Sequence, residues 1–134
     1  MTRRIRTLAV VFTLGVTLFG AVEGHAQTAR TRRVMQDKLA HAQHILAALT
    51  TSDYALLQKE TLALKKVTGS PQWAELMTAE LRPYTKDFLK ALADLSAAAD
   101  RRDYDAAGAS YGALTAACIG CHKHVMSSRI ASAD

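Results

Sequence analysis

Apolar residues recur at intervals of three and four positions in four stretches of the chain, the spacing that places them on one face of an α-helix. The stretches run from Arg32 to Leu49, from Tyr54 to Val67, from Pro83 to Ala99, and from Tyr104 to beyond Val125. No window alternates apolar and polar residues over the length of a strand, and Val and Ile are few after residue 26. The pattern therefore predicts an all-α protein.

The first and fourth stretches carry the most regular apolar faces. In the first, a 4,3,4,3 spacing joins Met35, Leu39, Ala42, Leu46 and Leu49. In the fourth, a similar spacing joins Ala107, Tyr111, Leu114, Cys118, Cys121 and Val125. This periodicity is typical of helices that pack side by side in a bundle, so we expect most of these side chains to share one core.

Polar and turn-forming residues separate the four stretches. Residues 50–53 offer N-cap side chains for the second helix, and Gly69 is suited to a left-handed cap at its end. Pro83 fits the first turn of the third helix, and residues 100–103 form a short polar turn before the fourth. Residues 72–82 predict at most a short helix in a longer connection. Mostly short turns between amphipathic helices favour an antiparallel four-helix bundle.

The N-terminal segment has the features of a secretory signal peptide. Arginines at positions 3, 4 and 6 precede an apolar run over residues 8–22, and the small residues Gly24 and Ala26 flank His25. Cleavage after Ala26 would leave residues 27–134 as one four-helix domain. The alternative is an uncleaved N-terminal anchor. We expect export to the periplasm and no membrane contact after cleavage.

Composition and charge exclude several classes of protein. Two Cys in 134 residues cannot build a disulfide-dense scaffold. The formal net charge of +5 includes three arginines and one glutamate from residues 1–26, so cleavage lowers it by two. The remaining basic residues form no stripe interleaved with aromatic side chains, and we therefore expect no nucleic-acid partner. No catalytic constellation is recognisable, which predicts that the protein is not an enzyme.

Both cysteines fall in one pentapeptide, residues 118–122, with the pattern C-x-x-C-H. On a helix, positions i, i+3 and i+4 share one face, so Cys118, Cys121 and His122 would point the same way. This pattern is the signature of covalent haem c attachment, in which the thiols bond the vinyl groups and the imidazole binds the iron. The sequence therefore predicts one haem c per chain in the core of the bundle.

Other chemistries fit the two cysteines less well. A redox dithiol of the thioredoxin type belongs near a βαβ pattern, which is absent from the sequence. A zinc site needs four ligands, and His122 and His124 follow the thiols too closely to complete one. A haem-free helical interaction domain with a Cys118–Cys121 disulfide stays open as the weaker alternative.

The motif on the last helix of an exported four-helix bundle resembles the class II c-type cytochromes, namely cytochrome c′ and its six-coordinate relatives. The resemblance covers the mature chain in architecture and is specific at Cys118, Cys121 and His122. It implies that a residue early in the first helix lies over the distal haem face. That residue is Met35 here, so the resemblance implies a Met/His iron, and it suggests that Arg32 or Arg33 contacts a haem propionate.

Other side chains are weaker site candidates. Met126 follows His122 by one turn and lies on the proximal side, whereas Met77 lies in the irregular connection. His41 and His44 point away from the face of Met35 and are predicted to be solvated, and His124 is expected to be exposed. Lys123 and Arg129 flank the motif as part of a solvated or partner-docking surface. Tyr111 and Phe88 suit either the core or the porphyrin.

These observations predict an exported mono-haem cytochrome that passes single electrons between redox partner proteins, which the sequence does not identify. The first alternative is a five-coordinate haem module that binds a small gas such as nitric oxide, which follows if Met35 does not bind the iron. Class II bundles often pair, so the resemblance also raises the prospect of a homodimer.

Overall fold

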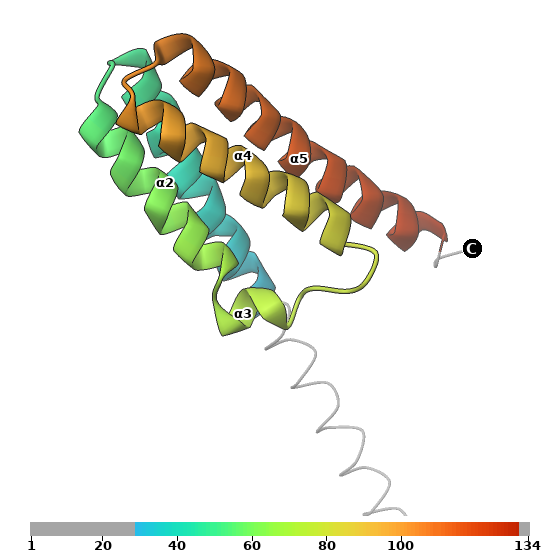
Figure 1. Cartoon of the computed structure of the whole chain (residues 1–134). Coiled ribbons are helices and arrows are strands. Elements are labelled where there is room, and N and C mark those ends of the chain that lie inside the picture. The colour runs from blue at the N-terminus through green and yellow to red at the C-terminus, as the bar shows by residue number, and fades with distance from the viewer. Residues whose placement is uncertain (1–28, 132–134) are drawn as a thin grey trace, which may run out of the picture.

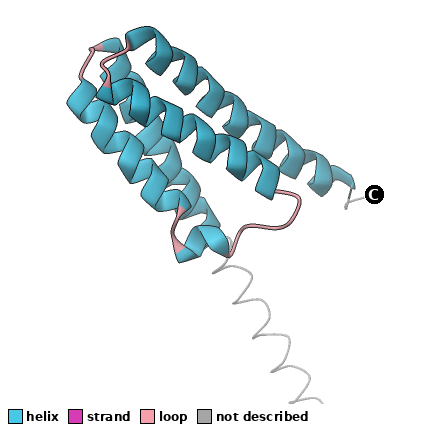
Figure 2. Ribbon diagram, viewed as in Figure 1, coloured by secondary structure: helices cyan, strands magenta, loops and turns pink. Residues whose placement is uncertain are grey.

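The computed structural model describes residues 29–131, except for the side chains of residues 129 and 130 (Figure 1). The first helix occupies residues 29–50 of this range. It is followed by α2 (Tyr54–Thr68), the single-turn α3 (Pro71–Ala74), α4 (Arg82–Asp100) and α5 (Tyr104–Ala131). The predicted signal segment, residues 1–26, lies outside the described residues. No strand occurs within residues 29–131, and loops are short except between α3 and α4 (Figure 2).

The helices form the predicted antiparallel four-helix bundle (Figure 1). The turn after the first helix and the turn between α4 and α5 lie at one end of the bundle, which we call the turn end. α3 and the connection that follows it lie at the opposite end, which we call the cavity end. α5 packs along α4, and α4 also packs against α2. Within the described residues, no helix is long and apolar enough to cross a bilayer.

Two matching turns close the turn end. Ser52 and Arg102 each adopt a left-handed conformation with φ 53°, and the residue after each caps the next helix. Asp53 accepts a hydrogen bond from the backbone N–H of Leu56, and Asp103 accepts one from that of Ala106. In each turn, the aspartate N–H donates to a carbonyl five residues earlier, which is the Schellman arrangement. Of the cap candidates at residues 50–53, Asp53 is the one that caps α2.

Two details of the helix ends can be compared with the sequence prediction. Pro83 lies in the first turn of α4, as predicted. The predicted left-handed cap at Gly69 is wrong, because this residue has φ −94° and its N–H continues the helical hydrogen bonds of α2. The chain turns at Ser70 instead, whose side chain accepts a hydrogen bond from the backbone N–H of Trp73 and so starts α3.

The core runs through the middle of the bundle. Its fully buried members from the first helix, α2, α4 and α5 are Ile45, Ala48, Leu57, Leu64, Leu92, Leu95, Ala98, Ala107 and Leu114. Burial of these apolar side chains is the main source of stability. Gln58 bridges α2 to α4 through hydrogen bonds with Ser96 and Asp100.

The predicted seam of the first helix is wrong at Leu46, which is 47% exposed. Leu39 is 58% exposed but borders an internal cavity together with the seam residues Met35 and Ala42. The inward face instead follows Met35, Lys38, Ala42, Ile45 and Leu49. The predicted helical period of the first helix is right, but the inward position after Met35 belongs to Lys38. A search for apolar residues does not detect a lysine at such a position.

Candidate functional site

The C-x-x-C-H motif lies in the second half of α5, and the helix holds its three functional side chains together. Cys118, Cys121 and His122 all border one cavity of about 230 Å³, whose walls are mostly apolar. The first helix, α2, α3 and α4 supply the other walls. The structure therefore brings the sequence-predicted thiols and imidazole to a single site.

Both thiols are free and half-buried, and no disulfide joins them. Burial raises the pKa of Cys118 and of Cys121, and the nearby Lys38 ammonium opposes that rise. A raised pKa keeps a thiol protonated and slows its oxidation. His122 borders the cavity and is exposed, so its imidazole is accessible at the cavity mouth.

The first helix contributes Met35 and Lys38 to the same cavity. Met35, the predicted distal residue, is partly buried there. The Lys38 ammonium lies 3.8 Å from the centre of the Trp73 ring and 4.0 Å from that of Phe88. These cation–π contacts hold a charge in an apolar place, and burial lowers the pKa of Lys38 to about 8.

Trp73 adds a second unusual polar group to the cavity wall. Its indole Nε1–H is buried and has no hydrogen-bond partner among the described residues. A buried donor left without an acceptor costs about 1–3 kcal/mol. Lys38 likewise forms no ion pair within the described part of the chain. A cation and an unpaired donor beside one cavity suit an anionic group on a bound ligand.

Aromatic side chains of α4 and α5 support the motif. A Cβ atom at Gly120 would lie 3.4 Å from the Tyr84 ring, an ordinary van der Waals distance, so the ring of α4 lies directly against the motif. The same ring contacts His124, with 5.6 Å between ring centres. Tyr111 borders the cavity and donates a hydrogen bond to the Ala42 carbonyl, which ties α5 to the first helix. Phe88 is buried in the core and also borders the cavity.

The weaker site candidates lie elsewhere. Met77 accepts a hydrogen bond from Thr85 and does not border the cavity, and Met126 is exposed. Arg32 and Arg33 are exposed, and Arg33 borders a different groove between the first helix and α2. Lys123 is exposed.

The prediction that the histidines of the first helix are solvated is confirmed for His44, which is exposed, and wrong for His41. His41 is partly buried, and both His41 and His44 contact the carboxylate of Glu60 on α2. They do point away from the face of Met35, as expected, but α2 packs against that side of the helix.

Sequence reasoning missed Lys38 and Trp73. Lys38 lies three residues after Met35, one helical turn along the same face, so its register position could have found it. Trp73 follows the Ser70-Pro71 helix start in a stretch without periodicity. Its position in the wall of the cavity depends on how the connection folds back, for which the sequence holds no comparable signal.

Solved structures share this fold. The chain is similar to a cytochrome c′ with a TM-score of 0.65 and 20% sequence identity, over 75% of this chain and 94% of that one. It is similar to cytochrome c′ from Rubrivivax gelatinosus, with a TM-score of 0.55 and 17% identity over 69% and 88% of the two chains. A nitric oxide complex of a cytochrome c prime variant from Alcaligenes xylosoxidans matches with a TM-score of 0.58 and 19% identity, over 72% and 92%.

These likenesses confirm the class II cytochrome resemblance at the level of the fold. The bundle is that of cytochrome c′. No protein-family model matches the sequence, and no curated protein sequence is significantly similar to it.

Proposed function

We propose that the chain is an exported, periplasmic protein that carries one haem c and transfers single electrons between redox partners. The observation that supports this most is the convergence of both thiols and the imidazole of the C-x-x-C-H motif on one apolar cavity, in a bundle with the cytochrome c′ fold. Cys118 and Cys121 would hold the group through thioether bonds, and His122 would bind the iron. The haem supplies the one-electron couple when bound.

The residues around the cavity fit such a group. Haem carries two propionates, and the unpaired Trp73 Nε1–H and the Lys38 ammonium are the donors that a propionate would accept from. We therefore assign propionate contact to these two residues in preference to Arg32 and Arg33, which do not border the cavity. The cavity is smaller than typical ligand pockets of about 300–1,000 Å³, so seating the macrocycle requires side chains at its mouth to move.

Met35 is the proposed second iron ligand. It lies on the first helix and borders the same cavity as the motif of α5, and its thioether would be a soft ligand that raises the potential of the iron. The apolar walls would exclude water from the site. We infer an electron carrier and not an enzyme.

Gas binding is the second proposal, and one observation favours it. A similar solved structure, the cytochrome c prime variant from Alcaligenes xylosoxidans, is a nitric oxide complex. If Met35 does not bind the iron, this chain would have a coordination position free for a gas. The two proposals differ in the resting ferric spectrum: low-spin with a sulfur-to-iron charge-transfer band for Met35 ligation, high-spin for an open site.

Haem attachment is tested by expressing the full chain in an exporting host that has the haem-attachment machinery. We expect covalent haem on a denaturing gel, its loss in Cys118→Ser/Cys121→Ser, and its retention in His124→Ala, the matched histidine control. In Met35→Leu, the charge-transfer band should disappear while the covalent haem remains. Absence of covalent haem in the wild-type chain would end both proposals and leave the haem-free interaction domain with a Cys118–Cys121 disulfide.

Partner contacts are proposed from exposed apolar side chains. Ile119, inside the motif, is 63% exposed, so the edge of the site beside it is where we place redox-partner docking. Leu46 is 47% exposed on the first helix, does not border the cavity, and is the residue we propose for a homodimer contact. Sedimentation of the purified protein and of Leu46→Ser tests the dimer.

A further inference from the structure

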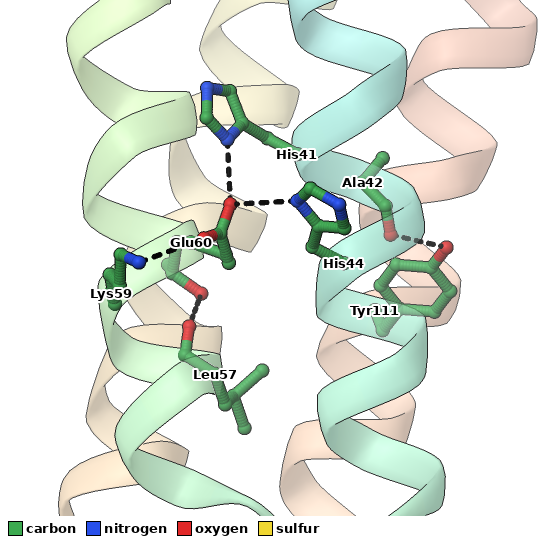
Figure 3. A network of polar contacts seen from close by, with 8 residues as sticks. His41, Ala42, His44, Leu57, Lys59, Glu60 and Tyr111 are labelled. Atoms are coloured by element: carbon green, nitrogen blue, oxygen red, sulfur yellow. Dashed lines mark hydrogen bonds and ion pairs between the residues drawn. The ribbon is translucent and has the colours of Figure 1, made fainter.

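A buried carboxylate lies between the first helix and α2, outside the haem cavity. Glu60 is 6% exposed and is the one buried charged residue in the described part of the chain. Burying a carboxylate is costly unless partners satisfy it. Its partners are two histidines: Glu60 Oε2 lies 2.7 Å from His41 Nδ1 and 3.3 Å from His44 Nδ1 (Figure 3). Three groups that commonly bind metals thus meet at one point.

The backbone prearranges this cluster. His41 and His44 are three residues apart on one helix, so their rings lie on one face, and Glu60 faces them from α2 (Figure 3). One ligand atom from each residue lies within 4.8 Å of those of the other two. In a tetrahedral site with bonds of about 2.0–2.1 Å, ligand atoms lie about 3.3 Å apart. The His44–Glu60 distance already has this value, and the His41–Glu60 distance needs to open by about half an ångström.

We propose that His41, His44 and Glu60 form a binding site for a divalent zinc-class ion, separate from the haem. Two imidazoles and one carboxylate suit zinc, whereas calcium and magnesium prefer all-oxygen sites. Three protein ligands leave a fourth position for water. His44 is 62% exposed at its side chain, which gives the ion a path from solvent.

Lys59 is the cation that contacts the cluster, and it can move away from a bound ion. Lys59 Nζ lies 3.9 Å from Glu60 Oε1, the oxygen that neither histidine contacts, and its side chain is 76% exposed and free to swing into solvent. None of the three proposed ligands borders the haem cavity. An ion held by both elements would clamp the first helix to α2, so it should stabilise the folded chain, because it binds the folded state and not the separated helices.

The test uses the purified full-length holoprotein, freed of metals with a chelator and then dialysed against zinc chloride. Metal analysis and calorimetry should give one tightly bound zinc per chain. His44→Ala and His41→Ala should each weaken binding at least about tenfold, since even residues that only support metal ligands cost that much. Zinc should raise the unfolding midpoint of the wild type and not of these two variants.

His124→Ala is the matched control, because it removes an imidazole outside the cluster and should bind zinc like the wild type. Glu60→Gln keeps the shape of the side chain and tests whether the carboxylate is needed. If that variant folds poorly, the variant at the exposed His44 still tests the proposal. The proposal is overturned if the wild type takes up less than one zinc per chain, or if zinc binds His41→Ala and His44→Ala as tightly as the wild type. Neither result depends on the role of the haem.

Discussion

The two ends of the bundle are built from the same four helices but differ in how completely their polar groups are paired. At the turn end, Ile45, Leu95 and Ala107 are fully buried, and two capped turns pair the backbone groups that the helices leave open. At the cavity end, the indole donor of Trp73 lacks a partner and Lys38 holds a charge between aromatic rings. The turn end is closed by packing and by capping hydrogen bonds within the chain, whereas the cavity end keeps a buried donor without a partner.

The largest expected effect compares two fully buried leucines in the haem-free Cys118→Ser/Cys121→Ser chain. Leu95→Ala opens a new void in dense packing and should cost near the upper part of about 2–5 kcal/mol in unfolding free energy. Leu114→Ala enlarges an existing cavity, where the side chain already lacks neighbours on one side, so it should cost near the lower part. Chemical denaturation measures both.

The same pair should behave differently with haem attached. The macrocycle would contact Leu114, so the cost of Leu114→Ala should rise toward that of Leu95→Ala in the holoprotein. Equal costs in the haem-free chain would contradict the idea that the two ends are packed differently.

A smaller effect concerns the charge at the cavity end. Burial lowers the pKa of Lys38 to about 8, below its value near 10.4 in the unfolded chain. Between these values the unfolded chain binds more protons, so stability should rise with pH, by at most about 1.4 kcal/mol per pH unit. In the Cys118→Ser/Cys121→Ser background, Lys38→Met should lack this rise. Denaturation at pH 7.5, 8.5 and 9.5 measures it, and parallel profiles would contradict the buried charge.

The smallest effect concerns the turn end. Ser52 and Arg102 adopt a left-handed conformation that costs a side-chain-bearing residue about 1–2 kcal/mol and suits glycine. Ser52→Gly and Arg102→Gly should therefore each stabilise the chain by about 0.5–1 kcal/mol, after the entropy cost of glycine. Arg101→Gly, at a residue with φ −84°, is the control and should destabilise. Thermal unfolding measures both effects: the unfolding midpoint should rise in Ser52→Gly and Arg102→Gly and fall in Arg101→Gly.

Much of the fold was predictable from the sequence because its signals are local. The four amphipathic stretches, the cap candidates at residues 50–53 and Pro83 in the first turn of α4 predicted the helices to within a few residues. The register of the first helix was not predictable from apolar pattern alone. Lys38 faces inward, where the Trp73 ring of α3 and the Phe88 ring of α4 lie against its ammonium group.

The candidate site likewise has a part that the sequence predicts and a part that it does not. The grouping of Cys118, Cys121 and His122 follows from helical spacing within one element. The unpaired Trp73 donor and the His41–His44–Glu60 cluster depend on contacts between elements distant in sequence. His44 and Glu60 are 16 residues apart and meet only after the first helix and α2 form a hairpin. Periodicity within one helix carries no information about such a partner.

The hydrogen bond from Tyr111 to Ala42 has a consequence for the order of folding. It joins residues 69 positions apart and draws the last helix onto the first, the two helices that carry the motif and Met35. The hairpin of the first helix with α2 and the hairpin of α4 with α5 close much shorter loops. They should form earlier, since long-range closure costs more entropy. We therefore expect the cavity to close last, so that a half-folded chain would keep its thiols within reach of the machinery that attaches the proposed haem.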